Sequence, residues 1–463
     1  MTILKHLRYP SQLFQKPTTS TMTPETIRNE SVLSADGSAQ SNGRLSTLAK
    51  SVIGSEILKI AGDIRRLVAD GKKICNLTVG DFSPSEFRPP QLLQAEIRES
   101  ITRGETNYPP SEGVLRLRQA VQAFYKREFG LEYPIESILV HGGSRPGIYG
   151  TFRTVVDPGD SVVYPVPSWN NNHYTNLVRG THVPVPCDAS TAFLPTAAQL
   201  KEHLRGARLL ALNSPLNPTG TAFTEQTLAE ICDLVIEENT RRGSGERPLY
   251  VMYDQVYWML TFGRTTHHDP VSLRQEMKPY TLLIDGISKA FASTGIRVGW
   301  TLGPADLIQR MGNILAHVGA WAPRAGQVAT AALLESDTAI RDYNKEIKAG
   351  VQQRLDALYQ GIMSMAADGF PVTAIEPMGA IYLSVRCDLN GVTMKDGTTL
   401  QTNEEIRQYL LDKAQVAMVP FQGFGSDDET GWCRFSVGAV SMDDIRQMFP
   451  RLRSALEGAA RQR

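Results

Sequence analysis

The sequence has few features of a membrane protein, a nucleic-acid-binding protein or a disulfide scaffold. It contains no uninterrupted apolar run of about 18 residues, the length that spans a bilayer. It has no net charge, because 48 Lys and Arg balance 48 Asp and Glu, so no strong field would attract nucleic acid or an anionic membrane. The five cysteines are scattered, which fits neither a disulfide framework nor a zinc site and favours a reducing compartment. We therefore expect a cytoplasmic protein without a metal site.

The first 45 residues differ in composition from the rest of the chain. They are rich in Ser and Thr, and their first acidic residue is Glu25. The segment lacks the apolar core of a secretion signal and has only three basic residues in its first 24. We interpret it as a disordered extension, or as the product of a start codon assigned too early with Met22 as the true start. A targeting segment stays open as the alternative.

The length of 463 residues predicts two domains, or one large domain with a smaller companion, because a single core rarely grows to this size. In the middle of the chain, short apolar runs alternate with helical stretches. These runs are continuously apolar, which is typical of a parallel sheet covered by helices on both sides. We expect strands over residues 137–143, 161–167, 208–213, 249–254, 280–286 and 298–303.

Helical patterns flank this central region. Residues 55–70 carry apolar side chains at helical spacing, with Ser55 as a plausible cap. Towards the C-terminus we expect strands over 379–386 and 433–439, with a helix over 404–414 between them. This mixture predicts a second domain of the α+β class.

The stretch GISKAFASTGIRVGW, residues 286–300, carries the clearest chemical signal. Lys289 directly follows a buried strand, where a charged ammonium is costly to bury. Desolvation lowers the basicity of such a lysine, and its neutral amine can attack an aldehyde to form a Schiff base. Eight residues on, Arg297 offers a rigid fork that can grip a phosphate. Taken alone, the pattern also fits a surface lysine at a strand end with an arginine in a loop.

This stretch resembles the lysine signature of the class I and II aminotransferases of the aspartate aminotransferase family, which are fold-type I pyridoxal-phosphate enzymes. Lys289, Gly295, Arg297 and Gly299 match that signature. The resemblance implies that Lys289 is catalytic and holds pyridoxal 5′-phosphate as a Schiff base. It also places Ser288 and Arg297 among the residues that bind the cofactor.

Two residues of the stretch depart from the family pattern. Ser293 stands where an apolar residue is usual, which is a matter of packing. Gly286 stands where many members have a phosphate-binding serine. The loss of that hydroxyl makes the remaining phosphate contacts more important.

Two further motifs follow the family's order. NSPLNPTG (213–220) is similar to the segment whose asparagine, here Asn217, bonds the 3′-oxygen of the cofactor and borders the substrate. YDQVY (253–257) resembles the segment in which Asp254 would pair with the pyridine nitrogen and keep it protonated. Tyr257 would bond the same 3′-oxygen as Asn217. Alone, these motifs also fit a turn asparagine and a helix cap.

Upstream, HGGSRPG (141–147) follows a strand and opens a helix. The resemblance implies that the backbone N–H groups of Gly143, Ser144 and Arg145 form the phosphate site at the helix N-terminus. Trp169 resembles the aromatic residue that stacks on the cofactor ring and contacts the substrate. The alternative for Trp169 is an ordinary core tryptophan.

Three residues outside this region complete the implied site. Tyr108, in NYPPSEG, resembles the tyrosine that reaches the phosphate of the neighbouring subunit, which would make the enzyme a homodimer with shared active sites. Arg434, in CRFSVG, resembles the arginine that forms a bidentate pair with the substrate α-carboxylate. Gly80, in NLTVGDF, resembles the glycine that lies over the substrate. Because Gly80 and Arg434 would belong to the small domain, domain closure would complete the pocket.

The resemblance extends over about residues 50–460. It implies an α/β protein of fold type I, with a mostly parallel seven-stranded sheet flanked by helices and a smaller α+β domain. We expect a large cofactor-binding domain over 95–345, with the small domain formed by 46–94 and 346–463 after a disordered extension over 1–45.

The implied reaction transfers an amino group from an L-amino acid to a 2-oxo acid, with Lys289 as general base and acid. Arg145 stands where one branch of the family has a basic residue that contacts a distal carboxylate, so we favour aspartate or glutamate as donor and 2-oxoglutarate or oxaloacetate as acceptor. If Arg145 contributes only its backbone, an aromatic or prephenate-type donor is open. The motifs also fit a lyase or an aminocyclopropane-carboxylate synthase. An aminotransferase-like regulator or a silent cofactor-binding protein fits them less well. Neither nucleic acid nor membrane is an expected partner.

Overall fold

The computed structural model describes residues 44–51 and 56–459. The predicted disordered extension therefore lies almost entirely outside the described residues. Among the described residues, a short helix, α1 (Thr47–Ser51), comes first. The remainder forms one compact unit that begins at Ser51 and is described from here on. Among its described residues no helix is both long enough and apolar enough to cross a membrane.

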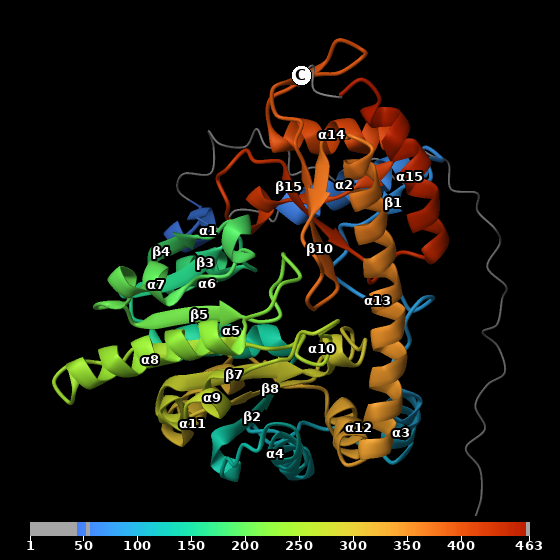
Figure 1. Cartoon of the computed structure of the whole chain (residues 1–463). Coiled ribbons are helices and arrows are strands. Elements are labelled where there is room, and N and C mark those ends of the chain that lie inside the picture. The colour runs from blue at the N-terminus through green and yellow to red at the C-terminus, as the bar shows by residue number, and fades with distance from the viewer. Residues whose placement is uncertain (1–43, 52–55, 460–463) are drawn as a thin grey trace, which may run out of the picture. The chain divides into compact units, whose positions relative to one another are not determined.

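A seven-stranded sheet forms the centre of this unit (Figure 1). Six of its strands run parallel to one another, and β8 alone runs antiparallel to both neighbours. This confirms the predicted mostly parallel seven-stranded sheet. In spatial order the strands are β2 (Ile138–His141), β8 (Gly299–Leu302), β7 (Thr281–Gly286), β6 (Tyr250–Asp254), β5 (Leu209–Asn213), β3 (Ser161–Val166) and β4 (Thr181–Pro186).

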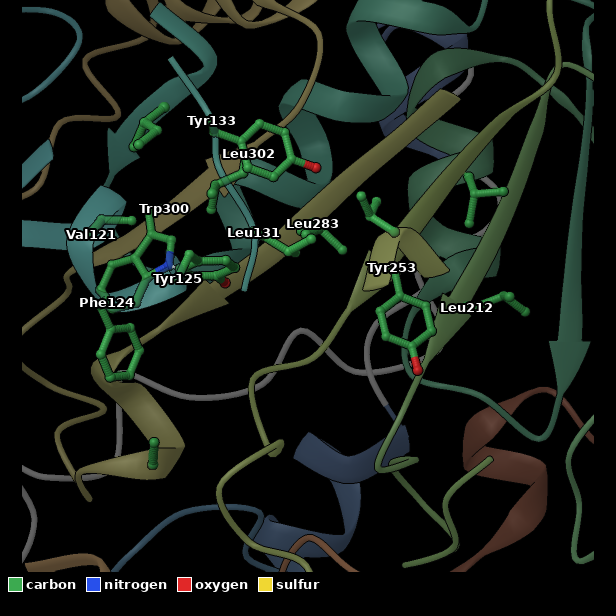
Figure 2. Packing of buried hydrophobic residues seen from close by; sticks show 14 of the residues in the cluster. Val121, Phe124, Tyr125, Leu131, Tyr133, Leu212, Tyr253, Leu283, Trp300 and Leu302 are labelled. Carbon is green, nitrogen blue, oxygen red and sulfur yellow. Dashed lines mark hydrogen bonds between the residues drawn. The ribbon is translucent and has the colours of Figure 1, made fainter. Parts of the chain in front are cut away.

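Helices cover both faces of the sheet, because successive apolar residues of each strand point to opposite sides. Leu210 and Leu212 of β5 pack into one core, which Figure 2 shows together with Trp300 and Tyr125. Leu209 and Ala211 pack into a separate core on the other face. The helices around the sheet are α3 (Gln91–Thr102), α4 (Leu115–Phe129), α5 (Ser144–Val155), α6 (Asn171–Val178), α7 (Ala197–Leu204), α8 (Glu225–Arg242), α9 (Pro270–Leu273), α10 (Ile287–Ala290), α11 (Ala305–His317) and α12 (Arg324–Leu334).

A second core forms around a four-stranded antiparallel sheet. Its strands are, in order, β14 (Val419–Pro420), β15 (Trp432–Ser436), β10 (Tyr382–Cys387) and β9 (Val372–Ala374). The N-terminal strand β1 (Cys75–Asn76) pairs in parallel with β13 (Val416–Ala417), so both ends of the unit contribute to this part. A small hairpin consists of β11 (Val392–Thr393) and β12 (Thr399–Leu400). The remaining helices are α2 (Glu56–Ala69), α14 (Asn403–Ala414) and α15 (Met442–Leu456).

One long helix, α13 (Asp337–Ala367), contributes to both cores. Ile340 near its start packs into the core of the large sheet, whereas Ile347 and Val351 pack into the second core. Figure 1 shows α13 running from beside α3 and α12 to the sheet of β10 and β15. The predicted boundary at residue 345 falls inside this continuous helix, and the domain limits stay a prediction.

The predicted strands and helices form, but several short strands of the second core and one edge strand of the large sheet were not predicted. The six expected central strands, the two C-terminal strands and the helices over 55–70 and 404–414 all form, with ends that differ by up to three residues. Strand β4 was not predicted. It carries Pro184 and Pro186 and is largely exposed, and proline within an apolar run argues against a strand except at a sheet edge, where β4 lies.

Candidate active site

Most of the predicted site residues come together because of the direction of the strands in the large sheet. The carboxyl ends of parallel strands lie at one edge of a sheet, and the loops that follow them meet there. Strands β2, β3, β5, β6 and β7 end at this edge, and the antiparallel β8 begins at it. A cavity of about 650 Å³ lies at this edge, and its lining includes Gly80, Ser144, Arg145, Trp169, Asn217, Asp254, Tyr257, Ser288, Lys289, Arg297 and Arg434.

Lys289 projects into this cavity from the short helix α10. Its ε-amine donates a 2.6 Å hydrogen bond to the carbonyl oxygen of Gly80. Removal from water lowers the pKa of the amine to about 8, with Arg434 and Arg145 lowering it further and Asp81 opposing them. Near neutral pH a useful fraction of this amine is therefore unprotonated, as a nucleophile or a general base requires.

Asp254 ends strand β6 and is 7% exposed. One of its carboxylate oxygens accepts a hydrogen bond of 3.2 Å from the backbone of Val256. Burial raises the pKa of this carboxyl to about 7, and the positive charge of Lys289 counteracts the rise only in part. The site thus holds a buried acid that would gain from a cationic partner.

A corner suited to an anion, called the anion corner below, lies at the N-terminus of α5. Gly143 precedes this 12-residue helix with φ of 80°, and the guanidinium of Arg297 packs so closely against it that any side chain would collide. Arg297 donates to the carbonyl oxygens of Thr294 (2.7 Å) and Gly142 (3.0 Å). The hydroxyl of Ser288 is buried and has no hydrogen-bond partner among the described residues. Helix N–H groups, a guanidinium and a spare hydroxyl are the ligands that phosphate takes in proteins.

The glycine at position 286, one of the two departures from the family signature, has a structural explanation. It pairs with Gly299 across β7 and β8, and a Cβ atom at position 286 would lie 2.7 Å from the Cα of Gly299. A serine is therefore sterically excluded in this arrangement.

Arg434 lines the cavity from strand β15. Its guanidinium donates to Asn217 Oδ1 (3.0 Å) and to the carbonyl oxygen of Thr78 (2.6 Å). The rings of Tyr382 and Phe424 each lie 4.7 Å from its central carbon. Its Nε is buried and lacks a partner among the described residues. A cation that is fixed in this way suits a carboxylate ligand.

Arg145 and Trp169 lie together in the cavity lining. The guanidinium of Arg145 lies over the indole of Trp169 at 5.2 Å, a cation–π contact. The Arg145 side chain is therefore directed over Trp169, within the cavity lining, although the residue is largely exposed.

Tyr108 does not line this cavity. It is 81% exposed and packs edge-on against Trp321, with ring centres 5.3 Å apart. Within one chain it is the predicted site residue that the structure places elsewhere.

Several residues of the site were not predicted from the sequence. Asp81 accepts a hydrogen bond of 2.6 Å from Thr294. Asn213 connects two site segments, because its side chain donates to the backbone of Asp254 (2.7 Å) and accepts from the backbone of Asn217 (2.8 Å). The position of Asn213 at the end of a predicted buried strand was a signal that could have identified it.

The fold and the site together define a class of α/β enzyme whose lysine amine, buried acid and anion corner surround one small-molecule cavity. The model of the family "Aminotransferase class I and II" matches residues 72–452. The chain belongs to this family, whose members use pyridoxal phosphate, and it is an aminotransferase.

Individual relatives agree with this assignment. An aspartate aminotransferase of Bacillus sp. (strain YM-2) is 29% identical over 82% of this chain and 92% of its own length. A bifunctional aspartate aminotransferase and glutamate/aspartate-prephenate aminotransferase of Petunia hybrida is 31% identical over 89% of this chain and 82% of its own. The crystal structure of an aspartate aminotransferase from Rhizobium meliloti superposes with a TM-score of 0.81 at 26% identity, covering 89% of this chain and 99% of that one.

Proposed function

We propose that this enzyme binds pyridoxal 5′-phosphate in the described cavity and transfers the amino group of aspartate or glutamate to a 2-oxo acid such as 2-oxoglutarate. One observation carries the proposal. The amine of Lys289, the carboxyl of Asp254 and the guanidinium groups of Arg297 and Arg434 all line a single cavity of about 650 Å³. That volume lies within the range of small-ligand sites in proteins.

The residues present fit this cofactor. Its phosphate would be held by the N-terminus of α5, Arg297 and the unpartnered hydroxyl of Ser288. Asp254 would pair with the protonated ring nitrogen, the cationic partner that this buried carboxyl lacks. When bound, pyridoxal phosphate accepts the amino group and withdraws electrons from the substrate α-carbon.

Lys289 would attach the cofactor covalently and also move a proton. Its amine has a pKa of about 8, so it exists in both protonation states near neutral pH. A group of this kind can take a proton from a substrate carbon and return it elsewhere. The carbonyl of Gly80, 2.6 Å away, gives the amine a fixed position within the cavity.

Asn217 and Tyr257 would both form hydrogen bonds to the 3′-oxygen of the cofactor. The carbonyl oxygen of the Asn217 amide accepts from Arg434, which leaves its NH₂ group to donate into the cavity. The side chain of Arg434 would bind the substrate α-carboxylate through its fork of N–H donors. Trp169 would stack on the cofactor ring, and Gly80 would lie over the substrate.

Arg145 supports the dicarboxylic donor. Its guanidinium is held over Trp169 within the cavity lining and could contact a second carboxylate. The relatives named aspartate aminotransferases point in the same direction. A second candidate is a prephenate-type donor, which the name of the Petunia hybrida relative favours.

We include a homodimer and a cytoplasmic location in the proposal. Tyr108 is well exposed beside Trp321, whose buried indole N–H has no partner among the described residues, so this face suits a second copy that receives Tyr108 at its phosphate site. All five cysteines are unpaired, as a reducing compartment would keep them. The proposed domain division remains 46–94 with 346–463 for the small domain and 95–345 for the large one.

The decisive test uses purified enzyme loaded with pyridoxal phosphate and a panel of amino donors with 2-oxoglutarate. Aspartate and glutamate should give the fastest turnover. Lys289→Ala should lose turnover and the absorbance near the visible edge that the bound cofactor gives. Lys345→Ala, at an exposed position on α13, is the matched control and should keep both. Persistence of the absorbance in Lys289→Ala would overturn the role given to Lys289. Product formation without an oxo acid would overturn the aminotransferase reaction and favour a lyase.

A further inference from the structure

Tyr382, at the start of β10, was not predicted as a site residue, and it contacts both Tyr257 and Arg434. Its hydroxyl lies 2.6 Å from the hydroxyl of Tyr257, and the two residues are 125 positions apart in the chain. Its ring lies under the guanidinium of Arg434 at 4.7 Å. The side chain is fully buried, at 0% exposure. Tyr382 thus bridges the residue proposed to touch the cofactor and the residue proposed to bind the substrate carboxylate.

The hydrogen bond between the two hydroxyls has a defined donor once the cofactor is present. Each tyrosine hydroxyl has one proton to donate. If Tyr257 donates its proton to the cofactor's 3′-oxygen, the short contact between the hydroxyls requires Tyr382 to be the donor to Tyr257. A chain of donors polarises each member, so this arrangement strengthens the hydrogen bond that Tyr257 gives.

The ring of Tyr382 has a separate task. It packs against the Arg434 guanidinium, as the ring of Phe424 also does, each ring centre lying 4.7 Å from the central carbon, and we call these two rings the clamp. An arginine that packs against two rings loses little further freedom when a carboxylate binds. The segment of Gly80 closes over the clamp, because a Cβ atom there would lie 3.0 Å from the Tyr382 hydroxyl.

We propose that Tyr382 is a positioning residue with two separable functions. Its hydroxyl directs the proton of Tyr257 towards the cofactor's 3′-oxygen, and its ring holds Arg434 in position for the α-carboxylate. This inference rests on the proposed function. It predicts that binding of the substrate carboxylate and the electronic state of the cofactor depend on one side chain.

The charged groups facing the two hydroxyls come from several elements. Arg434 faces them from β15, Asp254 from β6, and Asp81 from the segment after β1. The amine of Lys289 lies 5.9 Å from the centre of the Tyr257 ring. A change of Tyr382 to Phe leaves all four groups in place, so a shift in a pH midpoint would report the hydroxyl itself.

The experiment compares Tyr382→Phe and Tyr382→Leu with the wild-type enzyme, all loaded with pyridoxal phosphate. The first readout is the pH midpoint of the visible absorption of the bound cofactor. In Tyr382→Phe we expect this midpoint to rise by about half a unit to one unit, because a weaker donor stabilises the negative 3′-oxygen less. The KM for the amino donor should stay within about twofold, since the ring is kept.

Tyr382→Leu removes the ring as well. It should show the same rise of the midpoint and, in addition, an increase of at least about tenfold in KM for both amino donor and oxo acid, because Arg434 loses one ring of its clamp. Tyr359→Phe on α13 is the control and should change neither readout. If Tyr382→Leu does not fold, Tyr382→Met, which also lacks the ring and is closer in volume, takes its place with the same expected results.

Two results would overturn the inference. One is an unchanged midpoint in Tyr382→Phe, and the other is an equal KM increase in the Phe and Leu variants. A wild-type enzyme that shows no visible absorption with pyridoxal phosphate would instead refute the proposed function, so the two failures are distinguishable.

Discussion

The ε-amine of Lys289 and the carbonyl oxygen of Gly80 are 2.6 Å apart, although 209 positions separate the two residues in the chain. Gly80 follows β1, which pairs with a strand close to the C-terminus, and Lys289 follows the central strand β7. The reactive amine therefore touches a segment that belongs to the second core. Any movement between the two parts of the unit would change the surroundings of the amine, which gives the proposed domain closure a direct path to the reaction centre.

Replacement of Arg145 should separate substrate recognition from cofactor binding. Arg145→Ala keeps the backbone N–H at the start of α5 but removes the guanidinium over Trp169. We expect kcat/KM for aspartate to fall by about 10- to 100-fold, as for the loss of one charge-assisted contact, while that for phenylalanine changes by less than about threefold. Arg153→Ala, on the same helix and exposed, should affect neither donor. An equal loss of kcat/KM for both donors would show that Arg145 does not contact a distal carboxylate.

The sequence was sufficient to predict several residues that line the cavity, because they lie at or just after strand ends. Lys289, Asp254 and Asn217 follow apolar runs whose direction and pairing fix a common edge once the sheet is parallel. A strongly apolar run of five or six residues leaves little choice of local structure, so the predicted strands form and these three residues line one cavity.

Other parts of the site depend on contacts that no local pattern encodes. Tyr382 contacts Tyr257 and Arg434 from positions that are 125 and 52 residues away, and its own strand contains nothing that distinguishes it from a core tyrosine. The exclusion of a side chain at Gly286 likewise depends on its register with Gly299 across two strands. Such features require the tertiary arrangement.

The apoprotein should show a stability cost at Asp254 that cofactor binding removes. Burial raises the pKa of this carboxyl from 3.8 to about 7, so the folded apoprotein holds a proton that the unfolded chain has already released between these pH values. Stability contributed by this group is therefore present below about pH 4 and is lost as the pH rises towards 7. Asp254→Asn should be close to wild type at pH 4 and more stable by up to about 3 kcal/mol at pH 8.

Asp254→Asn should also bind pyridoxal phosphate at least about tenfold more weakly, because a neutral amide lacks the negative charge that stabilises a protonated ring nitrogen. Denaturant unfolding of the two apoproteins across the pH range tests the stability part, and titration of each apoprotein with the cofactor tests the affinity. A stability difference that is constant with pH would exclude an ionised, buried Asp254 as its cause.

Gly220 should be essential for the loop that carries Asn217. It has φ of 73°, and a Cβ atom there would lie 2.0 Å from the backbone carbonyl oxygen of Tyr382, so the loop and β10 are in direct backbone contact. Gly220→Ala combines the cost of an unfavourable φ with this collision, and we expect a loss of about 2–4 kcal/mol in the free energy of unfolding. Gly369→Ala is the matched control, since Gly369 has φ of 87° but no atom within 4 Å of an added Cβ. It should cost only about 1 kcal/mol, the contribution of the backbone alone. Denaturant unfolding of both variants measures the difference, and equal losses would mean that the approach of the loop to β10 contributes nothing.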